Sequence, residues 1–306
     1  MLKYEQMSDT KKLRYSIIIP CFNEELYIEA TLRSLEKQDY KGKFEVIVVD
    51  NNCTDKTAEL AKKYKARVIK EKRPGVCFAR QAGVDAAHAE IIISTDADTT
   101  FSKDWISKID REFNKNTDLI AVCGSCRYTK GPWWGKLYPH FLFGFVTIYN
   151  KLFKNIIYIT ATNIAFKKEF FEGYNTELTQ GGDEIALLDQ LKQKGPIKFK
   201  KSLKVNTSPR RLNRGLFYNI FVSFFYYYIL AYQLNKRFNK RIIGSAPAYR
   251  STKLKSLKIS PMAILFLIVV ASAIFMSGYF RHNFEISRDA YVLVKNAFSH
   301  IYNSLI

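Results

Sequence analysis

The stretch YSIIIPCFNEE (residues 15–25) joins a β-branched apolar run to a short polar segment, and this pairing decides how the chain folds. Similar apolar runs lie at 44–50, 66–70, 90–96 and 119–125, and amphipathic stretches separate them. Continuous apolar strands that alternate with helices are typical of a parallel sheet covered on both faces. The sequence therefore predicts an α/β domain with a mostly parallel sheet.

The polar segments that follow the strands are the most informative part of this pattern. Helices are expected between the strands, at 24–38, 55–64, 75–87 and 102–114. In such sheets, ligands bind beyond the carboxyl ends of the strands. The segments PCFNEE, DNNCTDKT, KRPGVCFAR and DADT should therefore meet at one edge, where we expect the functional site.

The segment IIISTDADT (91–99) places two carboxylates, Asp96 and Asp98, one residue apart at the end of a strand. On an extended backbone such residues point to the same side. Carboxylate oxygens are hard ligands that suit Mg²⁺ or Mn²⁺ bound together with a diphosphate. Because short acidic turns after strands are common, the meaning of this pair depends on its neighbours.

Those neighbours occur in an order that resembles the motif series of the family 2 glycosyltransferases, over residues 15–215. The family's PxxNE motif is matched by Pro20, Asn23 and Glu24. Its DDGSxDxT motif is matched by Asp50, Thr54, Asp55 and Thr57, with Asn51, Asn52 and Cys53 as departures. Its GxxxARNxG motif is matched by Gly75, Ala79, Arg80 and Gly83, with Gln81 in place of Asn.

The resemblance implies a GT-A fold, which is Rossmann-like, and an inverting transfer of a sugar from a nucleotide-diphosphate donor such as a UDP- or GDP-sugar. Asp50 would then accept the imide N–H of the uracil or guanine base. Mg²⁺ or Mn²⁺ on Asp96 and Asp98 would neutralise the leaving diphosphate. The donor-binding set is Pro20, Asn23, Glu24, Asp50, Arg80, Asp96 and Asp98.

A catalytic base is implied in GGDEIALLDQLKQKG (181–195), which resembles the family's Gly-Glu-Asp motif with the two acids reversed. The register of Gly182 and Leu187 assigns the base to Glu184, with Asp183 as the second choice. A helix N-terminus stabilises carboxylates even without catalysis, so capping is the competing interpretation.

The segment VNTSPRRLNRGLF resembles the TSxRR segment of many bacterial members, and it carries Arg210, Arg211 and Arg214. These cations could bind the donor diphosphate or a phosphate on a lipid acceptor. A solvated basic face would explain them equally well. The processive QxxRW motif is absent, which indicates addition of one sugar at a time.

The C-terminal part of the sequence changes to membrane-like composition. We divide the chain into an N-terminal extension (1–14), the transferase domain (15–215), an interfacial apolar helix with a basic link (216–260), a transmembrane helix (261–280) and a tail (281–306). The uncharged run 259–280 would be about 33 Å long as a helix, enough to span a bilayer. The run 216–232 could span, form a hairpin or lie in the interface.

Charge orients this arrangement and limits the partners. The formal net charge is +20, and eight basic residues lie between Gln233 and Lys258 without any acid. The positive-inside rule then places this basic link in the cytoplasm. With 216–232 in the interface or in a hairpin, the placement that we favour, the catalytic domain of this membrane protein is cytoplasmic as well. Basic residues beside apolar helices favour a membrane over nucleic acid. A lipid-linked, polyprenyl-phosphate or glycan acceptor for cell-envelope biosynthesis is therefore expected.

Two other functions fit parts of the sequence. A non-catalytic membrane-bound scaffold on the same fold would explain the DNNC departure, although it would not need Asp96, Asp98, Asp183 and Glu184. A sugar nucleotidyltransferase should carry a Gly- and Lys/Arg-rich loop after the first strand, and PCFNEE provides none. A dinucleotide oxidoreductase would need GxGxxG at the same place.

Overall fold

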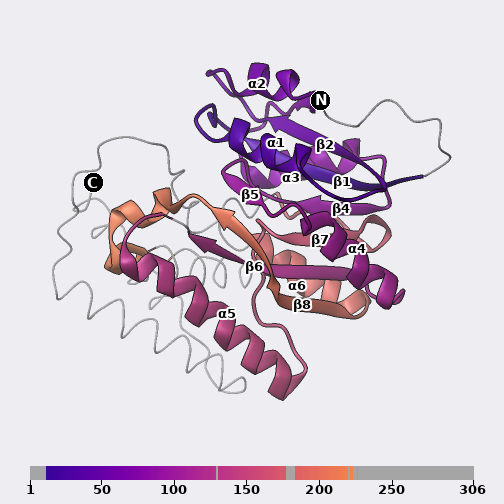
Figure 1. Cartoon of the computed structure of the whole chain (residues 1–306), viewed down its shortest axis with the longest axis vertical. Helices are drawn as coiled ribbons and strands as arrows, with labels where there is room; N and C mark the ends of the chain where they lie inside the picture. Colours follow the sequence, from indigo (N-terminus) through magenta and orange to yellow (C-terminus); the bar gives the residue numbers. More distant parts are fainter. Residues whose placement is uncertain (1–11, 129, 177–182, 220, 223–225, 227–306) are drawn as a thin grey trace, which may run out of the picture.

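The computed structural model describes residues 12–128, 130–176, 183–219, 221–222 and 226, which form an α/β domain around an eight-stranded sheet (Figure 1). The strands are β1 (Leu13–Cys21), β2 (Lys43–Asp50), β3 (Arg67–Lys70), β4 (Ile91–Ser94), β5 (Thr99–Phe101), β6 (Ala121–Tyr128), β7 (Ile164–Lys167) and β8 (Ile197–Thr207). The helices are α1 (Ile28–Glu36), α2 (Thr57–Lys63), α3 (Val76–Ala86), α4 (Trp105–Lys115), α5 (Trp133–Phe153) and α6 (Asp183–Lys194), with 3₁₀ turns η1 (Lys168–Phe170) and η2 (Pro209–Arg214).

The sheet has the order β3-β2-β1-β4-β7-β6-β8-β5 and is mixed: four of the seven pairings between its strands are parallel and three are antiparallel. The N-terminal half agrees with the sequence, because β1 pairs in parallel with β2 and β4, and β2 with β3. The second half departs from it: β7 runs antiparallel to both β4 and β6, and β5 antiparallel to β8. The short buried runs of the second half carry no direction in their pattern, so parallel and antiparallel pairing could not be separated.

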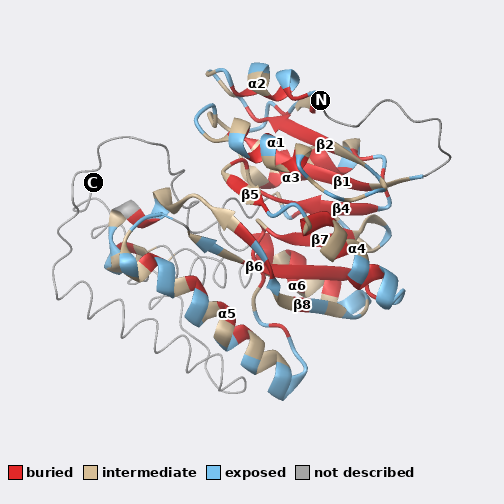
Figure 2. Cartoon of the chain, viewed as in Figure 1, coloured by how far each residue is buried: buried red, intermediate tan, exposed pale blue. Residues whose placement is uncertain are grey.

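Two hydrophobic cores cover the faces of the sheet. Helices α1, α2 and α4 pack on one face, around Leu32, Ala61 and Trp105. Helices α3, α5 and α6 pack on the other, around Cys77, Phe143 and Leu187, and the central strands β1 and β4 are mostly buried (Figure 2). Close packing explains Gly83 of α3, because a Cβ there would lie 2.2 Å from Cγ2 of Ile18 in β1.

The aromatic stretch WWGKLYPHFLFGFVTIYNKLF forms the 21-residue helix α5. No helix among the residues that the structure describes is both long and apolar enough to cross a membrane. The predicted transmembrane helix at 261–280, the tail 281–306 and nearly all of the segment 216–260 lie outside those residues.

Candidate active site

The predicted site residues lie at the edge of the sheet formed by the carboxyl ends of β1, β2, β4 and β8. Strand β8 ends at this edge because it runs parallel to β6, which in turn runs antiparallel to β7. Helix α3 follows β3 and α6 precedes β8, so both helices begin at the same edge. The topology therefore brings together side chains that are more than a hundred residues apart in sequence. The segments PCFNEE, DNNCTDKT, KRPGVCFAR and DADT meet at one edge, as predicted.

Arg80 of α3 is the buried centre of the cluster, with only 5% of its side chain exposed. Its guanidinium donates to Oδ1 of Asp96 at 2.8 Å and to Oγ of Ser94 at 2.6 Å, and Nε lies 3.5 Å from Oδ2 of Asp183. Burial alone would lower the pKa of Arg80, but the nearby carboxylates of Asp96 and Asp183, with other groups, outweigh it, so the pKa is raised. Arg80 thus joins the predicted metal-binding pair to the predicted base segment, and a solvated helix arginine is excluded.

The segment containing Asp96 and Asp98 forms a turn rather than the extended backbone expected from the sequence. The amide of Thr99 donates to the carbonyl of Asp96 at 3.3 Å, and Thr31 of α1 donates to the carbonyl of Ala97 at 2.7 Å. The two carboxylates consequently bind different arginines: Asp96 pairs with Arg80, whereas Oδ2 of Asp98 lies 3.0 Å from Nε of Arg210. Burial, opposed by Arg210, raises the pKa of Asp98.

Arg210, on η2, is the second cation of the site and connects three elements. Its two terminal nitrogens donate to the two carboxylate oxygens of Glu24, each at 2.7 Å, while Nε faces Asp98. The guanidinium also lies over the ring of Tyr27, 5.0 Å from its centroid. Bidentate pairs of this kind have fixed geometry, so Arg210 anchors η2 to the loop after β1. Glu24, expected to bind the donor, therefore holds an internal cation.

We expect Arg210→Ala to destabilise the metal-free protein by roughly 1–3 kcal/mol, because it leaves two largely buried carboxylates without their cation. Mn²⁺ should restore part of that loss, since a divalent ion at Asp98 would replace the missing positive charge. Thermal unfolding with and without Mn²⁺ measures both effects. An equal Mn²⁺-induced shift in the variant and the parent protein would contradict this role of Arg210.

The loop after β2 is organised around Asp50 and Asn51, both buried. Oδ1 of Asp50 accepts from the amide of Cys53 at 2.8 Å. Asn51 donates to the carbonyls of Glu71 and Arg73 and accepts from the amide of Gly75 at 2.9 Å. Asn51, which departs from the family motif, therefore ties this loop to the start of α3.

The PxxNE motif frames the other side of the same loop. Asn23 accepts from the amide of Thr54 at 2.7 Å, and the amide of Glu24 donates to Oγ1 of Thr57 at 2.8 Å. Pro20 occupies the penultimate position of β1, opposite Val49 of β2. These contacts make the two motifs one rigid unit beside the position expected for the nucleotide base.

Asp183 and Glu184 begin α6 and are both buried. Burial is the main cause that raises the pKa of Glu184, and the neighbouring Asp183 carboxyl adds to it. Asp183 faces Arg80, whereas the raised pKa lets Glu184 hold a proton at higher pH than an ordinary glutamate. The preceding Gly181 and Gly182 lie outside the described residues.

Several contributors to the site were missed by the sequence analysis. Thr207 donates to Oδ1 of Asp98 at 3.3 Å, and the amide of Ser208 donates to its carbonyl at 3.1 Å. The carbonyl of Ala161 accepts from Arg80 at 3.3 Å. Of the other predicted cations, Arg211 is exposed on η2, and Arg214 donates to the hydroxyl of Tyr218. A TSxRR segment directly after a strand was the one signal that could have led to Thr207.

The acidic pair fits a divalent ion in the number and kind of its ligands. Among the described residues, no group of three or more His, Cys, Asp or Glu side chains gathers as a metal site. Mg²⁺ needs no such group, because it is usually held by one or two carboxylates together with substrate phosphates and waters. Asp96 and Asp98 would supply those carboxylates, and the ion would compete with Arg210 for Asp98.

The chain resembles known glycosyltransferases in sequence. It is 36% identical over 106 residues to an uncharacterised glycosyltransferase of Mycobacterium bovis, covering 35% of this chain and 46% of the relative. It is 32% identical over 101 residues to the poly(ribitol-phosphate) β-N-acetylglucosaminyltransferase TarS of Staphylococcus aureus, covering 31% and 18%. The chain thus matches less than half the length of these curated relatives.

The fold agrees with this similarity. The crystal structure of S. aureus TarS 1-349 aligns with a TM-score of 0.52 and 18% identity, covering 74% of this chain and 72% of that one. The family model described as Glycosyl transferase family 2 matches residues 16–174, which include most of β1, all of β2 to β7, and Arg80, Asp96 and Asp98. More than half of the chain lies within that match, and so the chain belongs to glycosyl transferase family 2.

Proposed function

We propose that this chain is an inverting glycosyltransferase that moves one sugar from a UDP- or GDP-sugar to a lipid-linked acceptor at the cytoplasmic face of a membrane. The observation that carries the proposal is the Arg80 bridge, which holds Asp96 on one side and Asp183, next to Glu184, on the other. A diphosphate bound at Asp96 and Asp98 would thereby lie close to a candidate base. TarS has been crystallised with UDP and with UDP-GlcNAc, which supports a uridine donor.

The chemistry follows from the charges at the two sides of this bridge. Glu184 accepts a proton from an acceptor hydroxyl, whose oxygen attacks the anomeric carbon of the sugar, and the bond to the nucleotide diphosphate breaks. Mg²⁺ or Mn²⁺ on Asp96 and Asp98 would neutralise the charge that develops on the leaving diphosphate. Arg80 keeps both carboxylate groups in place without exposing its own charge to water.

The proposed role of Glu184 as a general base also distinguishes between the two possible acceptors, a polyprenyl phosphate and a lipid-linked sugar. A polyprenyl phosphate is already ionised and needs no base, whereas the hydroxyl of a lipid-linked sugar does. A buried carboxyl with a raised pKa is suited to take up a proton near neutral pH. We therefore favour a lipid-linked sugar over a polyprenyl phosphate as the acceptor.

Asp98→Asn should abolish turnover and weaken donor binding in Mn²⁺, because the amide keeps the size of the side chain but loses the charge that holds the ion. Titration of UDP- and GDP-sugars with and without Mn²⁺ measures this. Asp118→Asn is the matched control, since Asp118 is exposed just before β6, at the opposite edge of the sheet. Full activity of Asp98→Asn in excess EDTA would refute the metal assignment.

The proposed function itself is tested with membranes that contain the full-length protein. They are incubated with a panel of UDP- and GDP-sugars plus Mn²⁺, and nucleotide release is measured together with sugar incorporation into extracted lipid. Release coupled to incorporation supports the proposal. Release with incorporation only into a water-soluble glycan would refute the lipid acceptor, and no release from any donor would favour the scaffold alternative.

A further inference from the structure

Helix α5 carries an apolar stripe on its outer side. The stripe consists of six residues whose spacing of three or four keeps them on one side of a helix, each between 45% and 74% exposed: Trp133, Leu137, Phe141, Phe145, Ile148 and Leu152. Of the ten large hydrophobic residues that are exposed in the described part of the chain, seven lie on α5. Such a concentration on one element marks an interaction surface, because isolated exposed residues would be scattered.

The core does not need this stripe, because α5 is anchored by its opposite side. Pro139, Phe143 and Val146 are buried against the domain, and the ring of Phe143 stacks with that of Phe199 in β8 at 6.0 Å between centroids. Figure 2 shows α5 with buried residues along one side and exposed residues along the other. Helix α5 is therefore apolar on two sides, one buried against the domain and one exposed.

The charges beside the stripe indicate what it contacts. Chain segment 119–168 contains no acidic residue, and α5 has exposed lysines at Lys136 and Lys151. A third lysine, Lys201 of β8, reaches α5: its Nζ lies 3.4 Å from the point that a Cβ would occupy at Gly144. Aromatic residues flanked by lysines, without acids, are typical of helices that lie in the interface of an anionic membrane.

The position of α5 connects the stripe to the part of the chain that leads to the apolar C-terminal sequence. Leu212 of η2 packs at the start of α5, where Gly135 leaves room for it: a Cβ at Gly135 would lie only 2.3 Å from Cδ1 of Leu212. Phe217, three residues after Arg214 at the end of η2, is a further exposed apolar side chain, with 60% of its surface accessible. The sequence LFYNIFVSFFYYYILAY begins at residue 216, two residues after the end of η2.

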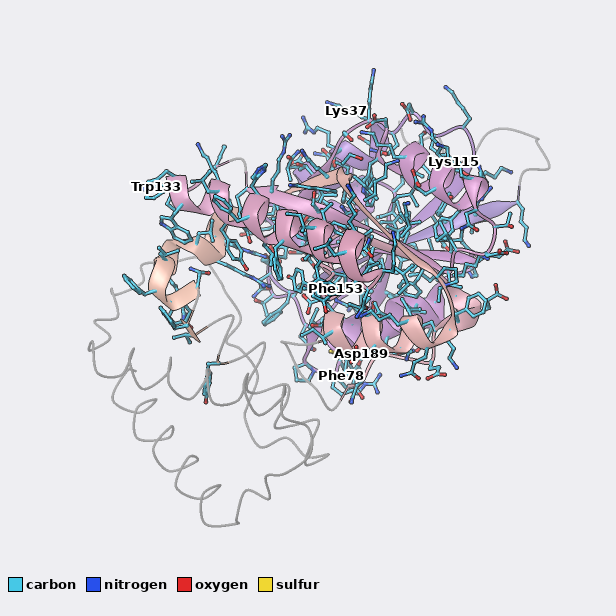
Figure 3. All side chains as sticks on the ribbon, turned by 90° about the horizontal axis from the view of Figure 1, so that it is seen from below. Lys37, Phe78, Lys115, Trp133, Phe153 and Asp189 are labelled. Atoms are coloured by element: carbon cyan, nitrogen blue, oxygen red, sulfur yellow. The ribbon has the colours of Figure 1, made fainter. Side chains whose placement is uncertain are left out.

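We infer that α5 lies in the interface of an anionic lipid bilayer, with the stripe inserted among the acyl chains and its lysines at the headgroups. The helix then sets the orientation of the domain, and η2 with Arg210 lies next to the membrane surface. This contact is additional to the C-terminal segments predicted from the sequence and does not depend on the identity of the acceptor. Figure 3 marks its two ends, Trp133 and Phe153.

The three tryptophans of the chain allow a direct test with the full-length protein in vesicles of phosphatidylcholine and phosphatidylglycerol. Trp133 and Trp134 begin α5, whereas Trp105 is fully buried in the core. Lipids brominated near the top of the acyl chains should quench most of the emission from Trp133 and Trp134. This emission is the difference between the parent protein and a Trp133→Phe, Trp134→Phe variant. The emission that remains in that variant, from Trp105, should be unaffected.

Substitutions within the stripe complete the test. Phe141→Asp with Phe145→Asp should remove the quenching, and the matched pair Phe141→Leu with Phe145→Leu should retain it. Equal quenching in both pairs would overturn the inference. Absence of quenching in the parent protein would overturn the inference as well. In that case, cross-linking between copies of a Phe145→Cys variant would show that the stripe is a dimer interface, and absence of cross-linking would show that it faces water or another part of the chain.

Discussion

Arg80→Met is expected to lower the free energy of unfolding by about 3–5 kcal/mol, the usual cost of removing one partner from a buried ion pair. The methionine fills much of the same space but leaves Asp96 and Asp183 without their shared cation. Those carboxylates would then repel each other in a largely dry environment. Urea denaturation at neutral pH measures the change, and activity should be lost with it.

The control for this prediction is another helix arginine. Arg33 of α1 pairs with Glu29 across one turn at the surface, so Arg33→Met should change stability little. The double variant Arg80→Met, Asp183→Asn should recover part of the stability, because one of the two unpaired charges is gone. An Arg80→Met protein as stable as the parent would show that the guanidinium does not hold the two sides of the site together.

Glu184→Gln should reduce turnover by a factor on the order of 10² or more, as loss of a general base usually does. Donor affinity should change little, because the amide keeps the shape of the side chain and Asp96, Asp98 and Arg80 are untouched. Single-turnover rates and donor titration separate these two effects. If Asp183→Asn is inactive and Glu184→Gln is active, the base is Asp183, and unfolding of either variant would favour the capping interpretation.

The pH dependence provides an independent readout of the same residue. Burial and the Asp183 carboxyl raise the pKa of Glu184, so activity should increase with pH around a midpoint well above the ordinary value of about 4.3. The stability effect has the opposite sign, because the folded protein holds this proton more strongly than the unfolded chain. Stability contributed by Glu184 should fall as pH rises from its unfolded to its folded pKa, and Glu184→Gln should remove that fall.

Much of this arrangement was predictable from local patterns. The alternation of β-branched runs and amphipathic stretches led to β1–β4 and α1–α4, although α1 begins four residues later than expected, at Ile28. The rule that ligands bind at the carboxyl ends of strands predicted one edge of the sheet for PCFNEE, DNNCTDKT and DADT, and Glu24, Asp50, Asp96 and Asp98 lie at that edge. These inferences succeeded because each depends on residues that are close together in the sequence.

The burial of Arg80 could also have been read from its helix, in retrospect. Arg80 follows Cys77 by three residues and precedes Val84 by four, so all three lie on the buried side of α3. The motif assigned the arginine to the diphosphate, and its position on the apolar side was overlooked. The stripe on α5 has the same kind of signature, since its spacing is visible in the aromatic stretch once that stretch is taken as a helix.

The sequence by itself determined the α/β class, the family motifs and the edge of the sheet at which the polar residues gather, because hydrophobic periodicity and strand-end positions are local properties. Only the tertiary structure decided the partners: Arg210 binds Glu24 across 186 residues, and Arg80 joins Asp96 to Asp183. A charged side chain carries no record in the sequence of which opposite charge will be near it. That choice is made when the end of β8 and the start of α6 reach the same edge of the sheet as the end of β4, an arrangement that depends on the antiparallel strand β7 between β4 and β6.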